Sequence, residues 1–174
     1  AYAAMLDAIA GAGRSILLES YIFDRDVIGL RFADALIAAV ARGVEVRVLI
    51  DAVGARYSVP SIVGYLEAAG VPTAVFNGNI IMGLRLPYAN LRTHRKILVV
   101  DGQVAFAGGM NIRVGFTSEI AGQSPAQDTH FRMLGPVVAD IFQVSAEDWQ
   151  FSSGEVLAGP AWAVEAAPLQ ADAP

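Results

Sequence analysis

Residues 93–111 read THRKILVVDGQVAFAGGMN, and this stretch decides the fold of the chain around it. Two apolar runs are joined by Asp101-Gly102, the kind of dipeptide that two-residue hairpin turns favour. We therefore predict an antiparallel hairpin with strands over 91–101 and 104–108. The Gly108-Gly109 pair follows the second strand, where a backbone without side chains can approach a ligand closely.

Strand and helix patterns alternate before the hairpin. Strands are predicted over 14–23, 44–51 and 71–76, and helices over 2–12, from Asp26 to Gly43, and over 61–69. After the hairpin we expect a strand over 129–134 and a helix from Pro136 to about Trp149. This order indicates an α/β fold with one mixed β-sheet flanked by helices on both faces.

The chain has 174 residues, which fits one domain of ordinary size. We place this domain over 1–152, and we interpret residues 153–174, rich in Ala, Pro and Gly, as a linker or tail. The chain starts with Ala1 rather than Met, which favours a fragment. No apolar run is long enough for a membrane span, and the start lacks a signal-peptide pattern.

The residue inventory excludes several kinds of site. Without cysteine there can be no disulfide scaffold, thiolate zinc site, thiol nucleophile or iron–sulfur cluster. His94 and His130 are the only histidines, so one chain cannot build a three-histidine metal site. Hydrophobic residues make up 55% of the chain, which is too apolar for disorder.

Charge is distributed unevenly along the chain. The net charge is −5, yet no Asp or Glu occurs between Glu67 and Asp101. The basic residues in that window are Arg85, Arg92, Arg95 and Lys96, the only lysine of the chain. An electropositive stretch in an acidic protein can attract a phosphate, although the net charge and the scarce basic–aromatic interleaving disfavour nucleic acid.

Three side chains of this stretch suit a phosphodiester. His94 and Lys96 share a face if residues 91–101 form a regular strand, and Asn111 returns after the hairpin. A neutral imidazole is a competent nucleophile near pH 7. An ammonium and an amide can donate to the non-bridging oxygens, where charge builds up in the transition state.

At these residues the chain resembles the phospholipase D superfamily, whose motif is H-x-K-x4-D-x6-G-(G/S)-x-N. The matching positions are His94, Lys96, Asp101, Gly108, Gly109 and Asn111. The surroundings are similar to the bacterial cardiolipin synthase branch, in ESYIF at 19–23, RGVEVRVLID at 42–51, NLRTHRK at 90–96, GGMNI at 108–112, DTHFR at 128–132 and GPVV at 135–138. The resemblance covers residues 1–152 and implies a phospholipase D-like lobe.

The resemblance implies a phosphatidyltransferase that acts on phospholipid phosphodiesters through a phosphohistidine on His94. A second histidine would protonate the leaving alcohol, and Lys96 and Asn111 would hold the phosphate. It implies no metal and no other cofactor. Gly109 would offer its backbone N–H to the phosphate, and the hydroxyl contact of the serine that many relatives have at this position would be absent.

The resemblance also counts Asp101 among the catalytic residues. In a regular strand its side chain would point to the opposite face from that of His94, and it occupies a position where a hairpin turn favours aspartate. A structural or orienting role is therefore preferred over direct chemistry. His130 is expected to be structural on its strand.

Three further residues are candidates around the site. Relatives often place an acidic residue shortly after the motif asparagine to hold the nucleophilic histidine, and here the first carboxylate after Asn111 is Glu119. Arg92 and Asn90 are candidates for the entrance. The apolar run at 80–84, beside Arg85, either touches a bilayer or packs under a loop, and the second is preferred.

The family's site needs two such motifs, and this chain contains one. The second lobe would come from a homodimer or from a missing part of the protein beyond the tail. Expected partners are a phospholipid substrate, the second lobe and a membrane surface. The alternatives are a homodimeric phosphodiesterase or nuclease, and a catalytically silent half-site or scaffold. We expect the protein in the cytoplasm or peripherally on the inner membrane.

Overall fold

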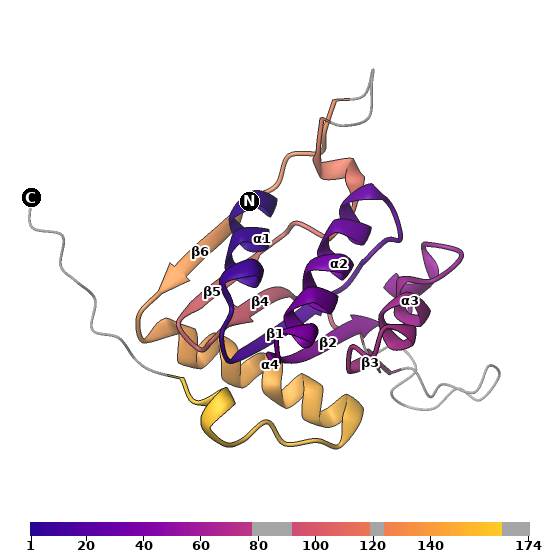
Figure 1. Ribbon diagram of the computed structural model, residues 1–174. Helices are drawn as coiled ribbons and strands as arrows, with labels where there is room; N and C mark the ends of the chain where they lie inside the picture. The colour runs from indigo at the N-terminus through magenta and orange to yellow at the C-terminus, as the bar shows by residue number, and fades with distance from the viewer. Residues whose placement is uncertain (78–91, 119–123, 165–174) are drawn as a thin grey trace, which may run out of the picture.

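The computed structural model describes residues 1–77, 92–118 and 124–164. Within them, six strands form one sheet in the order β3-β2-β1-β4-β5-β6 (Figure 1). The strands are β1 (Ser15–Ser20), β2 (Glu45–Asp51), β3 (Thr73–Phe76), β4 (Lys96–Val100), β5 (Val104–Gly108) and β6 (His130–Leu134). The helices are α1 (Tyr2–Gly11), α2 (Val27–Ala41), α3 (Ile62–Ala68) and α4 (Val137–Ser153).

The sheet combines parallel and antiparallel pairing, which confirms the predicted mixed sheet. β1, β2 and β3 are parallel, and α2 and α3 provide the crossovers that parallel strands need. β4 runs antiparallel to β1, and β5 and β6 continue antiparallel. In this register Ser20, the last residue of β1, lies opposite Lys96, the first residue of β4. The pairing thus brings the end of β1 to the start of β4.

Helices cover both faces of the sheet, as predicted (Figure 1). Alternate residues of the central strands point to opposite sides. On one face Ile16 and Leu18 pack in a core with α1, α2 and α3. On the other face Leu17 packs in a second core with Val138 and Trp149 of α4. Of the helices in the described residues, none is long and apolar enough to cross a membrane.

Two predicted local signals are confirmed. The Asp26 carboxylate caps α2 by accepting from the N–H groups of Ile28 and Gly29, both at 2.9 Å. In the hairpin turn, Asp101 and Gly102 have φ of 54° and 62°, the left-handed region that a type I′ turn requires at both positions.

Some residues after 152 also pack against the sheet and α4. The Arg47 guanidinium binds the Glu155 carboxylate at 2.6 and 2.7 Å. Trp162 is buried, and its indole N–H donates to Glu45 at 2.9 Å. Packing an indole against the sheet removes a large apolar area from water, which explains why this part of the expected tail folds back.

Candidate active site

His94 and Lys96 lie at the start of β4. The strand begins at Lys96, so His94 precedes it instead of lying inside the strand expected over 91–101. The His94 side chain is exposed, whereas Lys96 is 5% exposed. The Tyr21 ring lies 4.7 Å from the imidazole, centroid to centroid, and 5.3 Å from Lys96 Nζ. Both side chains thus contact one ring, in agreement with the shared face that strand alternation predicts.

The Lys96 ammonium is held next to the histidine. Its Nζ donates to the main-chain carbonyl of His94 at 2.6 Å. Burial lowers the pKa of Lys96, and the Asp128 carboxylate opposes that shift. A cation with part of its hydration removed attracts an incoming anion more strongly than one in bulk water does.

Tyr21 lies outside the motif, so the sequence did not mark it as a candidate. It follows β1 directly, and Ser20 of that strand pairs with Lys96, so its place is set by the sheet register. Burial raises the pKa of its phenol, as does the nearby phenol of Tyr57, and the charge of Arg92 opposes the shift. Arg92 is exposed and acts on Tyr21, but its role at an entrance stays a prediction.

Asn111 is held from the same segment. Its Oδ1 accepts from the backbone N–H of Ile22 at 3.0 Å, and its main-chain carbonyl accepts from the Tyr2 hydroxyl. The first bond uses the acceptor of the amide and orients the NH₂ group, which is the donor that an anion needs. Tyr21 contacts His94 and Lys96, and the next residue binds Asn111, so one dipeptide connects all three candidates.

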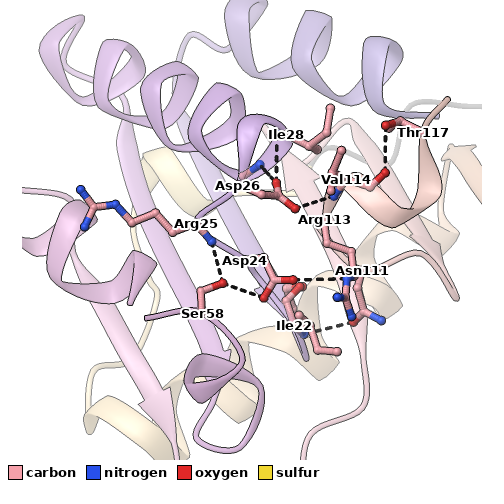
Figure 2. Close-up of polar contacts among 12 residues, drawn as sticks. Ile22, Asp24, Arg25, Asp26, Ile28, Ser58, Asn111, Arg113, Val114 and Thr117 are labelled. Atoms are coloured by element: carbon pink, nitrogen blue, oxygen red, sulfur yellow. Dashed lines mark hydrogen bonds and ion pairs between the residues drawn. The ribbon is translucent and has the colours of Figure 1, made fainter. Parts of the chain in front are cut away.

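Further contacts tie residues 22–26 to residues 111–114, as Figure 2 shows. The Asp24 carboxylate binds Arg113 Nε at 3.2 Å and accepts from the Ser58 hydroxyl at 2.8 Å. Asp26, the cap of α2, also accepts from the N–H of Val114 at 2.6 Å. The loop that carries Asn111 is thereby fastened to the start of α2.

The expectation for the Gly109 backbone is corrected. Its N–H donates to the Thr129 carbonyl at 3.0 Å, just beyond the last paired residues of β5 and β6, so in this structure it is already used within the chain. A Cβ at this glycine would lie 2.1 Å from Asp128 Oδ1. Asp128, which lies outside the motif, is therefore an acidic group close to both Gly109 and Lys96.

The structure does not bring Asp101 to His94, so it gives no support to the catalytic role that the resemblance implies, and the structural role preferred from sequence remains the prediction. Its carboxylate accepts from the backbone N–H groups of Gly13, Arg14 and Ser15 at 2.8–2.9 Å. It lies five residues beyond Lys96 along an extended strand, which is about 17 Å at 3.4 Å per residue. At that distance it cannot touch a phosphate held by Lys96, and it joins the turn to the start of β1.

The remaining candidates differ in what the structure says about them. Glu119, Asn90 and the apolar run at 80–84 lie outside the described residues. His130 faces Gly108 on β6, burial lowers its pKa, and neither ring nitrogen has a hydrogen-bond partner within the described part of the chain. Nor do the described residues contain a cluster of three or more His, Asp or Glu side chains that could hold a metal ion.

The arrangement combines an exposed imidazole, a partly desolvated ammonium and an oriented amide. An imidazole can attack an electrophilic phosphorus, and two donors can stabilise the charge that develops on its oxygens. Of the groups named from sequence, Lys96 lies with His94 against the Tyr21 ring, and Asn111 is bound by the residue that follows Tyr21. Asp101 and the Gly109 N–H are bound to other parts of the chain.

Comparisons of sequence point to one family. A family profile described as cardiolipin synthase, PLD-like domain, matches residues 5–118. Cardiolipin synthase A of Pseudomonas aeruginosa is 36% identical over 152 residues, which are 87% of this chain and 31% of that protein. Cardiolipin synthase B of Salmonella typhimurium is 38% identical over 148 residues, or 84% of this chain and 35% of that protein. The chain spans about a third of the length of these relatives.

Comparisons of structure agree on the fold. Nuc of Salmonella typhimurium, described as a phospholipase D family member, aligns with a TM-score of 0.61 at 20% identity, over 86% of this chain and 87% of that one. Phosphatidylserine synthase of Haemophilus influenzae aligns with a TM-score of 0.60 at 16% identity, over 80% of this chain and 32% of that one. Both likenesses agree with the predicted single lobe.

Proposed function

The chain belongs to the phospholipase D-like domain family of the cardiolipin synthases, and we propose that it forms one catalytic lobe of a phosphatidyltransferase acting on phospholipid phosphodiesters. The observation that carries this proposal is the Tyr21-Ile22 dipeptide. The Tyr21 ring contacts His94 and Lys96, and the Ile22 N–H orients the Asn111 amide. This dipeptide links the proposed nucleophile to two proposed anion donors, which supports an assignment to phosphodiester chemistry.

In the proposed reaction a nitrogen of neutral His94 attacks the substrate phosphorus. The N–P bond forms as the P–O bond to the leaving alcohol breaks, and a second histidine from another lobe protonates the departing oxygen. An incoming alcohol then loses its proton to that second histidine, attacks phosphorus and releases His94. The outcome is a new phosphodiester, and water in place of the alcohol gives hydrolysis.

Lys96 and the NH₂ group of Asn111 donate to the non-bridging oxygens in this scheme. The exposed Asp128, near Lys96 and Gly109, is a second candidate beside Glu119 for a carboxylate that steadies the site. The place of Asp101 supports a structural role for it.

The second histidine must come from elsewhere, because the chain carries one copy of the motif. We infer a second lobe, supplied either by a symmetric partner copy or by another part of a longer protein. The short span of the chain relative to its relatives supports the second source. With a bilayer lipid as substrate, the enzyme works at a membrane surface, in the cytoplasm or bound peripherally to the inner membrane.

The test begins with the native mass of the chain, measured by light scattering over a concentration series. A dimer is then incubated with phosphatidylglycerol vesicles, and we expect cardiolipin and glycerol as products, with none from His94→Ala. If the chain is monomeric, the same assay is made on the longer protein that contains it. Absence of lipid turnover in the complete two-lobe form would contradict the proposal, and salt-sensitive DNA binding with DNA cleavage would favour the nuclease alternative.

A further inference from the structure

The peptide immediately before His94 is held by two buried carboxylates. Thr93 is 2% exposed, and its hydroxyl donates to Glu19 Oε1. Its backbone N–H donates to Asp51 Oδ2 at 3.0 Å. Glu19 and Asp51 are each 0% exposed. Both the side chain and the main chain of Thr93 therefore have a fixed partner in the sheet.

Helix α4, which covers the face of the sheet to which Glu19 points, completes this anchor. The Ser145 hydroxyl donates to Glu19 Oε2 at 2.9 Å, and the Asp148 carboxyl faces Glu19. Asp148 is also paired with Arg95. The residues on either side of His94 are thus connected to one pair of carboxyl groups, Thr93 to Glu19 and Arg95 to Asp148.

The polar character of this cluster needs an explanation, because packing alone does not require it. Leu17, on the same side of β1, packs in the core that includes α4. A carboxyl group at Glu19 is costly there, and burial, with the Asp148 carboxyl, raises its pKa to about 7 against the opposing Thr93 and Ser145 hydroxyls. An apolar side chain would avoid this cost but would give Thr93 no acceptor.

We propose that Glu19 and Thr93 form a positioning pair, whose hydroxyl–carboxyl bond fixes the peptide that presents His94 to the substrate phosphorus. This inference rests on the proposed function, in which His94 is the nucleophile. The side chain of His94 is exposed and contacts Tyr21 on one side. The orientation of its imidazole therefore depends on how firmly the main chain of His94 is held. A misplacement of about 1 Å is enough to cost about a hundredfold in rate.

The test compares three substitutions of threonine. Thr93→Val removes the hydroxyl at nearly constant shape, and Thr93→Ser retains it. Thr73→Val is the matched control, because Thr73 also loses one hydrogen bond, to the Val71 carbonyl at 3.0 Å, but lies on β3. Thermal unfolding is followed for each variant, so that activity is compared at equal folded fraction.

The kinetic measurement is turnover of phosphatidylglycerol by the protein in its two-lobe form. We expect Thr93→Val to lower kcat about 10- to 100-fold with KM unchanged, because positioning acts on the attack and not on lipid binding. Thr93→Ser should recover most of the rate, and Thr73→Val should match the wild type. A Thr93→Val protein with wild-type kcat and a lower melting temperature would overturn the proposal.

A second measurement needs no activity, which separates this inference from the proposed function. The chain has two histidines, so ¹H–¹³C spectra of labelled imidazoles give one signal for His94 and one for His130. We expect Thr93→Val to shift or broaden the His94 signal alone, and Thr73→Val to leave both unchanged. If no substrate is turned over, this result still decides: an unchanged His94 signal in Thr93→Val overturns the positioning role.

Discussion

At the start of β4, His94 is exposed and Lys96 is 5% exposed, whereas at its end Asp101 is bound by three backbone N–H groups. Both ends belong to one sequence motif. The first end leaves an imidazole accessible to a ligand, and the second uses a carboxylate to join the turn to the start of β1. In the proposed function, neighbours in one motif therefore serve chemistry and folding separately.

Replacing His94 by Ala should have the largest effect on activity and almost none on stability. We expect turnover of phosphatidylglycerol to fall by about 10⁴-fold or more, since the nucleophile is lost. The melting temperature should stay within a degree or two of the wild type, because an exposed side chain contributes little to the core. His130→Ala serves as the control with the other histidine, and a wild-type rate in His94→Ala would refute the assignment.

Replacing Lys96 by Met should give the second-largest loss of activity. Loss of one phosphate donor is expected to lower kcat by about 10²–10³-fold. The free energy of unfolding in urea should be unchanged or higher, because an apolar chain replaces a buried cation. A large loss of stability with normal kcat would instead assign Lys96 to the fold.

Asp101→Ala should lower stability and leave activity unchanged. Three N–H groups lose a charged acceptor, and alanine must adopt a φ of 54°, so we expect a loss of about 3–4 kcal/mol in the free energy of unfolding. Turnover per folded molecule should stay normal. Asp101→Asn, which tolerates the left-handed conformation, should lose less. Urea titration measures all three proteins, and a kcat effect at full folding would remove the contrast between the two ends.

The raised pKa of Glu19, near the His94 end of β4, should make the free energy of unfolding depend on pH. Glu19 has its pKa raised from 4.5 to about 7, so the folded protein binds this proton more tightly than the unfolded chain does. Its favourable contribution is complete below pH 4.5 and is lost as pH rises through 7, by up to about 3 kcal/mol.

Glu19→Gln isolates that contribution. The lowered pKa of His130 acts in the opposite direction, since it costs stability as pH falls below 6.5. Subtracting the unfolding free energies of Glu19→Gln from those of the wild type cancels the His130 part. We expect the difference to decline between pH 4.5 and 7. A difference that is flat with pH would contradict the shifted carboxyl.

Much of the fold could be predicted because its signals are local. The hairpin follows from apolar runs around Asp101-Gly102, and the α2 cap from Asp26 before a helical period. Parity along the strand also argued against chemistry at Asp101. The packing of Trp162 was missed, since an Ala-, Gly- and Pro-rich composition carries no sign of the sheet that the indole covers.

The sequence by itself determined the hairpin, the mixed α/β class and the family motif with His94, Lys96 and Asn111. Tertiary structure alone decided that Tyr21 contacts His94 and that Thr93 binds Glu19. It also decided that the Gly109 N–H donates to the Thr129 carbonyl. The physical reason is the register of β1 on β4, which sets Ser20 opposite Lys96. Hydrogen bonds between strands join residues far apart in the chain, and no periodicity within one segment specifies which residues will meet.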